Sequence, residues 1–367
     1  MEEDFPRSGQ EMVAEYHHLM ARRLILLAVC IAGIVLFGGL FSLSTYPDIT
    51  LKETYEIIWH HLTGKTYDIN VDAYRWWADR HIWNTAMPHL VVAVLAGASL
   101  AACGTLMQAI MGNPLADPYS TGISSGAVFG VAVSVILGIS VSAISSQLSN
   151  FGVILNAFIF AMIPMAFIIL ISPRTNTSPA TLILAGVAIS YLFNALTTLL
   201  MMSTDSETLA TVYRWQVGSV AEITWPSVPL MAAINIAGIA AAIILSKKLN
   251  ILALGDDSAK SLGLNAQNMR LVCLMIVTFM AASVIAYAGI ISFIGLISAH
   301  IVRTVLDSDS RFVIPASAGF GALFMLFADI CARLISDNDA VPIGVMLSFI
   351  GAPIFLILII RQKRAVW

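Results

Sequence analysis

Residues 24–41 read LILLAVCIAGIVLFGGLF, an uncharged apolar run that directly follows Arg22 and Arg23. A helix needs about 20 mostly apolar residues to cross the hydrocarbon core of a bilayer. Lipid offers no partner to unpaired backbone groups, so a run of this kind is expected to be helical. The chain contains ten such stretches, which we place at residues 24–44, 88–111, 121–139, 152–172, 180–202, 228–246, 270–287, 289–305, 313–335 and 342–361. The predicted fold class is therefore an all-α polytopic membrane protein with about ten transmembrane helices.

The composition agrees with a single transmembrane domain over residues 1–367. Hydrophobic residues make up 58% of the chain and charged residues 11%, whereas a soluble globular protein has about 45–50% and about 25%. The net charge of −3 provides no strongly basic face, so we expect no nucleic-acid partner. The first apolar run is long for a signal-peptide core and no small-residue cleavage site follows it, so we expect an uncleaved anchor.

The distribution of Lys and Arg predicts the orientation of the spans. With the N-terminus inside, thirteen of the 19 Lys and Arg residues fall in cytoplasmic segments and six in external ones. Positive charge accumulates on the cytoplasmic side, so both termini are predicted to be cytoplasmic. The main connections are then a cytoplasmic N-terminal segment 1–23, a long external loop 45–87 and a cytoplasmic loop 247–269. Tryptophan prefers the headgroup level, so part of the external loop is expected to lie along the outer interface.

Three patterns that imitate functional sites are set aside. Gly64-Lys65-Thr66 resembles the end of a phosphate-binding loop, but the glycine required five positions before Gly64 is replaced by Trp59. The adjacent pair His60-His61 points in two directions on any regular element, which is poor ligand geometry. The four cysteines lie in apolar segments and indicate neither a disulfide framework nor a metal site. We predict no catalytic residue, no metal site and no cofactor bound by this chain.

Two connections between spans carry distinctive residues. The segment Gly112–Pro118 contains two prolines, an Asn and an Asp, which are expected to break the helix at the cytoplasmic surface. The segment 249–270 reads LNILALGDDSAKSLGLNAQNMR, in which Gly255 and Gly263 bracket a short polar stretch that begins with Asp256-Asp257. Acidic residues favour a helix N-terminus and glycine favours its end. We therefore predict one or two short helices beneath the membrane, where they could engage a soluble partner.

Two features inside the spans have structural consequences. Gly351-Ala352-Pro353 is expected to interrupt the last span in mid-membrane. Asp329 is an acidic residue well inside a span, and a charge there costs about 2.5–3.5 kcal/mol on insertion scales. Arg333 lies four residues later on the same helix face, so the two are expected to pair. A role of Asp329 in transport or docking remains the alternative.

Several stretches together resemble the iron–siderophore, haem and cobalamin permease family of bacterial and archaeal ABC importers (type II importers). They occur in the family's order from about residue 83 to the C-terminus: NPLADP (113–118), GISSGA (122–127), LILAGVAIS (182–190), WQVGSV (215–220), LALGDDSAKSLGLN (252–265), AGIISFIGLISAHIVR (288–303), FADICARL (327–334) and VPIGVMLSFIGAPIF (341–355). Members of that family have ten spans, and they carry no catalytic site for ATP hydrolysis.

The resemblance implies roles for individual residues. The stretch 252–265 would form the coupling helices that dock on the ATP-hydrolysing subunit, through Leu254, Gly255, Asp256, Asp257, Ala259, Leu262 and Gly263. The cytoplasmic gate would include Asn113, Pro114 and Leu115. The fifth and tenth spans would line the path, with polar or soft positions at Asn194, Thr197, Thr198 and Met201.

The chain departs from the family pattern at its outer surface. Many members begin the second span with Arg-Leu-Pro-Arg, whereas this chain has Ala86-Met87-Pro88-His89. In the family these two arginines contact the binding protein, so Arg333, with Arg80 or Arg75, supplies the remaining candidates for that docking. On the cytoplasmic side, Gly112 replaces an Arg and Ala299 replaces a Pro that are common in the family.

The function implied is the membrane subunit of an ATP-driven importer for a bulky metal chelate, located in the cell membrane of a bacterium or archaeon. The expected partners are a second copy of the chain, two ATP-binding cassette subunits that hold ATP-Mg, and an extracytoplasmic substrate-binding protein. The alternative is a secondary transporter driven by an ion gradient, which would need ionisable residues near the midplane. A membrane enzyme is a third possibility, but no catalytic cluster occurs in the spans.

Overall fold

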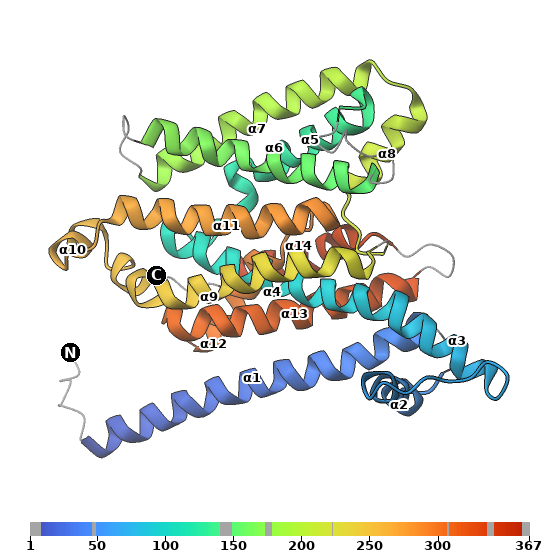
Figure 1. Cartoon of the computed structure of the whole chain (residues 1–367). Coiled ribbons are helices and arrows are strands. Elements are labelled where there is room, and N and C mark those ends of the chain that lie inside the picture. The colour runs from blue at the N-terminus through green and yellow to red at the C-terminus, as the bar shows by residue number, and fades with distance from the viewer. Residues whose placement is uncertain are drawn as a thin grey trace.

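The computed structural model describes residues 9–45, 49–139, 149–172, 178–221, 223–306, 308–335 and 341–361, and these residues contain no β-strand. They form a bundle of α-helices (Figure 1). The helices are α1 (Gly9–Thr45), α2 (Leu51–Leu62), α3 (Ala73–His81), α4 (Met87–Met111), α5 (Ile123–Leu137), α6 (Ser149–Ile171), α7 (Pro179–Met202), α8 (Ser206–Gln216), α9 (Val228–Leu252), α10 (Asp256–Ser261), α11 (Ala266–Ala288), α12 (Ile294–Leu306), α13 (Ser310–Ile335) and α14 (Ile343–Arg361). The all-α class is confirmed.

Each of the ten predicted spans coincides with one long or moderately long apolar helix. Within the described residues, seven helices are long and apolar enough to cross a membrane, and α5, α12 and α14 supply three shorter apolar segments. The start of α1 and the short helix α10 lie at one end of the bundle, and α2, α3 and α8 lie at the other (Figure 1). This arrangement agrees with a cytoplasmic loop 247–269 on the same side as the N-terminus and an external loop 45–87.

Two of the predicted helix boundaries are wrong. The eighth span begins at Ile294 and not at residue 289, because Gly289 and Phe293 both have positive φ angles and residues 289–292 are not helical. The last span is not interrupted at Gly351-Ala352-Pro353, since α14 continues through Pro353. A proline removes only one backbone donor, and a continuous helix satisfies most of the remaining groups in lipid.

Helix α4 is the centre of the bundle and packs against α9, α11, α12 and α13. Most of its residues are buried, and small residues allow close contact at two crossings. A side chain at Gly97 would collide with Gly321 of α13, and one at Gly104 would collide with Gly295 of α12. Small residues let helix backbones approach in lipid, where dispersion contacts replace the hydrophobic effect as the source of association.

The helices α1, α7 and α9 are far more exposed than α4, and only 22% of the apolar window of each is buried. Their exposure does not come from weak helix ends, because the residues at their starts are typical of helix N-termini. Helix α7, for example, begins with the cap Ser178, whose side chain accepts a hydrogen bond from the Thr181 backbone, and with Pro179 in the first turn. The exposed apolar faces of these helices therefore require lipid or another protein chain as their partner.

Candidate functional site

The predicted coupling segment forms a short helix that projects from the cytoplasmic end of the bundle. Gly255 has a φ of 95° and precedes α10, which begins at Asp256. The apolar side chains that flank this helix are exposed, Leu254 by 63% and Leu262 by 61%. Ala259 is fully buried. Of the seven residues assigned to coupling, six reach the surface, and Ala259 instead seats the helix against the rest of the bundle.

A buried arginine fixes the start of α10. Two nitrogens of Arg270 donate hydrogen bonds to the two carboxylate oxygens of Asp256, at 2.8 and 2.5 Å. The Nε of Arg270 donates to the backbone carbonyl of Ile110 in the last turn of α4, at 2.9 Å. The Arg270 guanidinium also lowers the pKa of Asp256. Nothing in the sequence pattern predicted this contact, because Arg270 and Ile110 are 160 residues apart.

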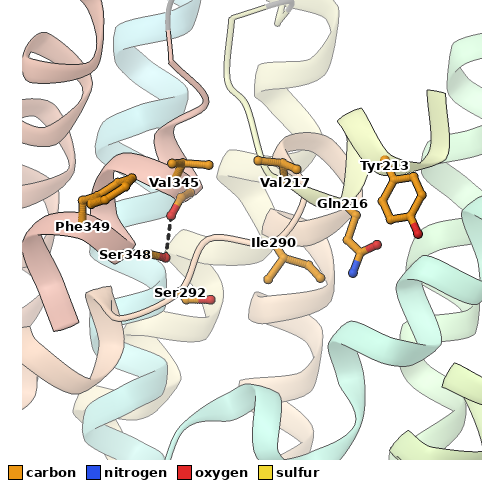
Figure 2. A pocket seen from close by; sticks show the side chains of 9 residues that line it. Tyr213, Gln216, Val217, Ile290, Ser292, Val345, Ser348 and Phe349 are labelled. Carbon is orange, nitrogen blue, oxygen red and sulfur yellow. Dashed lines mark hydrogen bonds between the residues drawn. The ribbon is translucent and has the colours of Figure 1, made fainter. Parts of the chain in front are cut away.

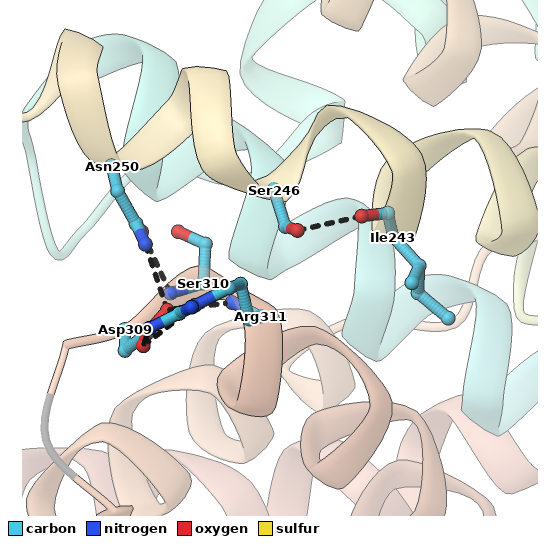
Figure 3. A network of polar contacts seen from close by, with 6 residues as sticks. All are labelled: Ile243, Ser246, Asn250, Asp309, Ser310 and Arg311. Atoms are coloured by element: carbon cyan, nitrogen blue, oxygen red, sulfur yellow. Dashed lines mark hydrogen bonds and ion pairs between the residues drawn. The ribbon is translucent and has the colours of Figure 1, made fainter.

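A second polar network holds the end of α9, just before the coupling segment (Figure 3). Asn250 donates to the carboxylate of Asp309 at 2.7 Å and accepts from the backbone N–H of Ser310 at 2.8 Å. Arg311 pairs with the same carboxylate at 2.7 Å. Burial raises the pKa of Asp309, but the hydrogen bonds from Arg311 and Asn250 outweigh it and lower that pKa to about 2. Asp309 therefore stays ionised at neutral pH and links α9 to the start of α13.

The predicted gate residues form a tight turn after α4. Gly112 ends the helix with a φ of 56°. The backbone N–H of Leu115 donates to the side-chain oxygen of Asn113 at 2.9 Å, and Ala116 donates to the Asn113 carbonyl at 3.1 Å. Pro114 is half-buried and Leu115 is exposed. The predicted break between the second and third spans is confirmed, while its role as a gate stays a prediction.

A cavity of about 600 Å³ opens between α8, the segment 290–292 and the start of α14 (Figure 2). Its polar side chains are all uncharged, and the ring of Phe349 lies at one edge (Figure 2). The lining residues are Tyr213, Gln216, Val217, Ile290, Ser292, Gly344, Val345, Ser348 and Phe349. The resemblance implied a path along the fifth and tenth spans; the tenth span, α14, lines this cavity, and its role in a path stays a prediction.

The cavity depends on close backbone contact between the end of α8, the segment that follows α11 and the start of α14. A side chain at Gly289 would collide with the Trp215 carbonyl, and one at Gly344 would collide with the Val217 carbonyl. The backbone N–H of Ser219 donates to the Ala288 carbonyl at 2.8 Å. Irregular backbone at membrane depth is tolerated where protein buries it or where it lines a wet cavity. Here the contacts with residues 215–219 bury the non-helical backbone after α11, which allows the eighth span to start late.

The four lining residues predicted on α7 do not contribute to this cavity. Asn194 and Thr198 are exposed, Met201 is half-buried and Thr197 is buried. The hydroxyls of Thr197 and Thr198 donate to carbonyls of their own helix at 2.8 Å each. Asn194 and Thr198 nevertheless place polar groups on an otherwise apolar exposed face. Lipid disfavours such groups, so this face is better suited to a protein or aqueous partner.

At the outer end of the bundle, Arg333 is engaged within the protein. It lies 3.5 Å from the carboxylate of Asp329 and 3.0 Å from a ring nitrogen of His89, and it stacks over the ring of Phe41 at 4.5 Å. The predicted Asp329–Arg333 pair is confirmed. His89 completes it with a 3.0 Å contact to Asp329. The Arg333 side chain is only 17% exposed.

The other candidate for docking, Arg80 of α3, is exposed and stacks over Trp76 at 4.7 Å.

The external loop folds into the two helices α2 and α3. Trp59 and Trp77 are 70% and 58% exposed. His61 pairs with Asp79 at 2.8 Å and stacks on Trp83 with ring centroids 4.0 Å apart. His61 of α2 therefore holds α2 against α3 and the residues after it, which together form the external hairpin. The exposed tryptophans are placed as expected for rings that meet the outer interface.

Known proteins resemble this chain over most of its length. The FecCD transport family matches residues 34–361. The iron(3+)-hydroxamate import system permease protein FhuB of Bacillus subtilis is 33% identical over 341 residues, which cover 92% of this chain and 84% of that protein. The vitamin B12 import system permease protein BtuC of Klebsiella pneumoniae is 36% identical over 282 residues, covering 77% and 83%.

A solved structure described as an inward-facing conformation of a metal-chelate type ABC transporter superposes with a TM-score of 0.76 at 26% identity, covering 93% of this chain and all of that one. The bundle, the exposed cytoplasmic helix and these matches lead to one assignment. The chain is a multi-pass protein of the cell membrane and belongs to the FecCD transport family of permeases.

Proposed function

We propose that the chain is the membrane-spanning permease subunit of an ATP-driven importer, with a bulky metal chelate as its cargo. The observation that carries the proposal is the exposed cytoplasmic helix α10 with Leu254 and Leu262 on either side of it. Two large apolar side chains held in water beside a short fixed helix mark a protein-binding surface. The family match supports a nucleotide-binding subunit as the partner at this surface.

The second part of the proposal is a homodimer with the path on its twofold axis. Each chain supplies one coupling helix, whereas a pair of ATP-binding cassette subunits that closes symmetrically requires two. The exposed polar residues Asn194 and Thr198 on α7 support a partner on that face. ATP-Mg would be held by the two cassette subunits, and an extracytoplasmic binding protein would deliver the cargo. This chain would perform no chemistry.

In the proposed mechanism, closure of the cassette subunits displaces α10, and the displacement tilts the helices around the path. The turn at Asn113–Leu115 would act as the cytoplasmic gate, since it lies at the end of the central helix α4. The outer cavity beside α8 would receive the cargo. Its serine, tyrosine and glutamine side chains offer hydrogen bonds without fixed charge. Such a surface binds a large chelate weakly enough to release it.

The cargo class follows from the relatives, whose names include iron(3+)-hydroxamate and vitamin B12. An iron–siderophore, haem or cobalamin would fit the proposal, and the binding protein would select among them. The experiment is uptake into proteoliposomes that contain the permease, its cassette subunit and its binding protein, with a ferric hydroxamate, haem and cobalamin offered in turn. ATP-dependent accumulation of one of these supports the proposal.

One observation also argues against a secondary transporter driven by an ion gradient. Asp329, an acidic residue inside a predicted span, is held by Arg333 and His89 rather than facing a path. A proton- or sodium-coupled carrier needs an ionisable group that can be exposed to each side in turn. Accumulation driven by an ion gradient in liposomes without the cassette subunit would overturn the importer proposal.

A further inference from the structure

Arg270 lies between two parts of the molecule that the proposed function assigns to separate tasks. One side of its guanidinium holds Asp256, the first residue of α10, through two hydrogen bonds. The other side holds the carbonyl of Ile110, two residues before Gly112 ends α4 and three before Asn113. The Arg270 side chain is only 7% exposed. A single buried side chain therefore connects the coupling helix to the last turn of α4, directly before the turn of the proposed gate.

The charges and dipoles at this point favour a stiff connection. The carboxylate of Asp256 lies at the N-terminus of α10, where negative charge is stabilised. The guanidinium of Arg270, a residue of α11, reaches the C-terminus of α4, where a cation can bond a carbonyl that has no partner within the helix. The planar guanidinium binds a carboxylate through two parallel hydrogen bonds, which fixes orientation as well as distance. Ala259 of α10 is fully buried, so α10 is seated on the bundle both there and through Asp256.

We propose that Arg270 is a positioning residue that transmits the movement of α10 to the turn Gly112–Leu115. The proposal rests on the importer function above. Arg270 does more than hold α10 in place, because the carbonyl that it binds belongs to α4, the helix that leads into the proposed gate. The network of Asn250, Asp309 and Arg311 also fastens the cytoplasmic side, but its hydrogen bonds join the end of α9 to the start of α13 rather than α10 to α4 (Figure 3). It therefore provides a matched comparison.

The experiment compares Arg270→Gln, Asp256→Asn and the control Arg311→Gln in the complete transporter. Each variant is reconstituted with its cassette and binding proteins, and ATP hydrolysis and cargo uptake are measured on the same proteoliposomes. A second measurement places Cys at Leu115 in each background and records its labelling by a membrane-impermeant maleimide with and without ATP. The same background without this Cys measures labelling of the four natural cysteines.

The expected result separates hydrolysis from transport. Arg270→Gln and Asp256→Asn should still bind the cassette subunit and hydrolyse ATP, while the amount of cargo moved per ATP falls about tenfold or more, the factor expected from losing one charged hydrogen bond. ATP should no longer change the labelling at position 115. Arg311→Gln should keep both the transport ratio and the ATP-dependent labelling.

Two results would overturn the proposal. One is a normal amount of cargo per ATP in either variant, with normal ATP-dependent labelling. The other is a failure of both variants to assemble with the cassette subunit, since Arg270 would then hold α10 in place and transmit nothing. If the unaltered transporter itself shows no ATP-driven uptake, the proposed importer function fails. Normal coupled transport in the Arg270→Gln variant, in contrast, overturns only the role proposed for Arg270.

Discussion

The two leucines beside α10 allow a quantitative test of the proposed coupling surface. The double substitution Leu254→Ala and Leu262→Ala removes three carbon atoms from each side chain and leaves the helix backbone unchanged. The side chains are 63% and 61% exposed in the isolated chain, so docking of a partner could bury well over half of each. At about 0.8 kcal/mol for each buried carbon, the loss is about 1.5 kcal/mol per leucine and about 3 kcal/mol for both.

That loss corresponds to an increase of roughly 100-fold in the Kd for the cassette subunit. The assay is binding of the purified cassette subunit to the permease in nanodiscs, measured by biolayer interferometry at several concentrations. Val71 provides the control, because it is 84% exposed but lies in the external loop between α2 and α3. Val71→Ala should leave the Kd unchanged.

The reasoning would be refuted by a double variant that binds the cassette subunit within about twofold of the unaltered chain, a difference of less than about 0.5 kcal/mol. An equal loss of affinity in Val71→Ala would also refute it, since the effect could not then be assigned to the cytoplasmic surface. Melting temperatures of the two variants in detergent should match that of the unaltered chain, because the removed atoms contact few neighbours.

Three further predictions concern other parts of the bundle. Gly289→Ala should lower the yield of folded protein in size-exclusion chromatography, because the new methyl group collides with the Trp215 carbonyl and the residue needs a positive φ; recovery equal to the unaltered chain would contradict the backbone contact. Arg333→Ala should destabilise the chain by about 3–5 kcal/mol, because it leaves a buried carboxylate without its cation, and a denaturant titration that shows no shift would exclude the buried pair. In nanodiscs with brominated lipids, a variant that keeps Trp59 alone should be quenched more strongly than one that keeps Trp83 alone, because Trp59 is exposed and Trp83 stacks on His61; equal quenching would place the hairpin away from the lipid.

Much of the fold could be predicted because each span is a local property of the chain. A stretch such as residues 24–41 carries enough apolar side chains to cross the bilayer without help from distant residues. The short helix α10 could also be predicted, since Gly255, the acidic pair and Gly263 act within a few residues of one another. The pairing of Asp329 with Arg333 followed from their spacing on one helix.

The errors came from places where distant segments determine the backbone. The late start of α12 depends on the contact of residues 288–290 with Trp215, Gly218 and Ser219, which no local pattern reveals. The continuity of α14 through Pro353 reflects the cost of an unpaired backbone in the membrane rather than the proline alone. The burial of Ala259 and the engagement of Arg333 by His89 likewise required the packed bundle.

By itself, the sequence determined that the chain lies in a membrane, where its apolar spans fall and that it resembles a permease family, and it predicted their orientation. These properties follow from local apolar length and charge placement and from the order of the motifs along the chain. Only the tertiary structure decided which residues meet. Arg270 bridges Asp256 and Ile110, and the outer cavity forms where α8, residues 290–292 and α14 converge. Most of these contacts join residues that are far apart in the chain, so they form only once the helices have packed together.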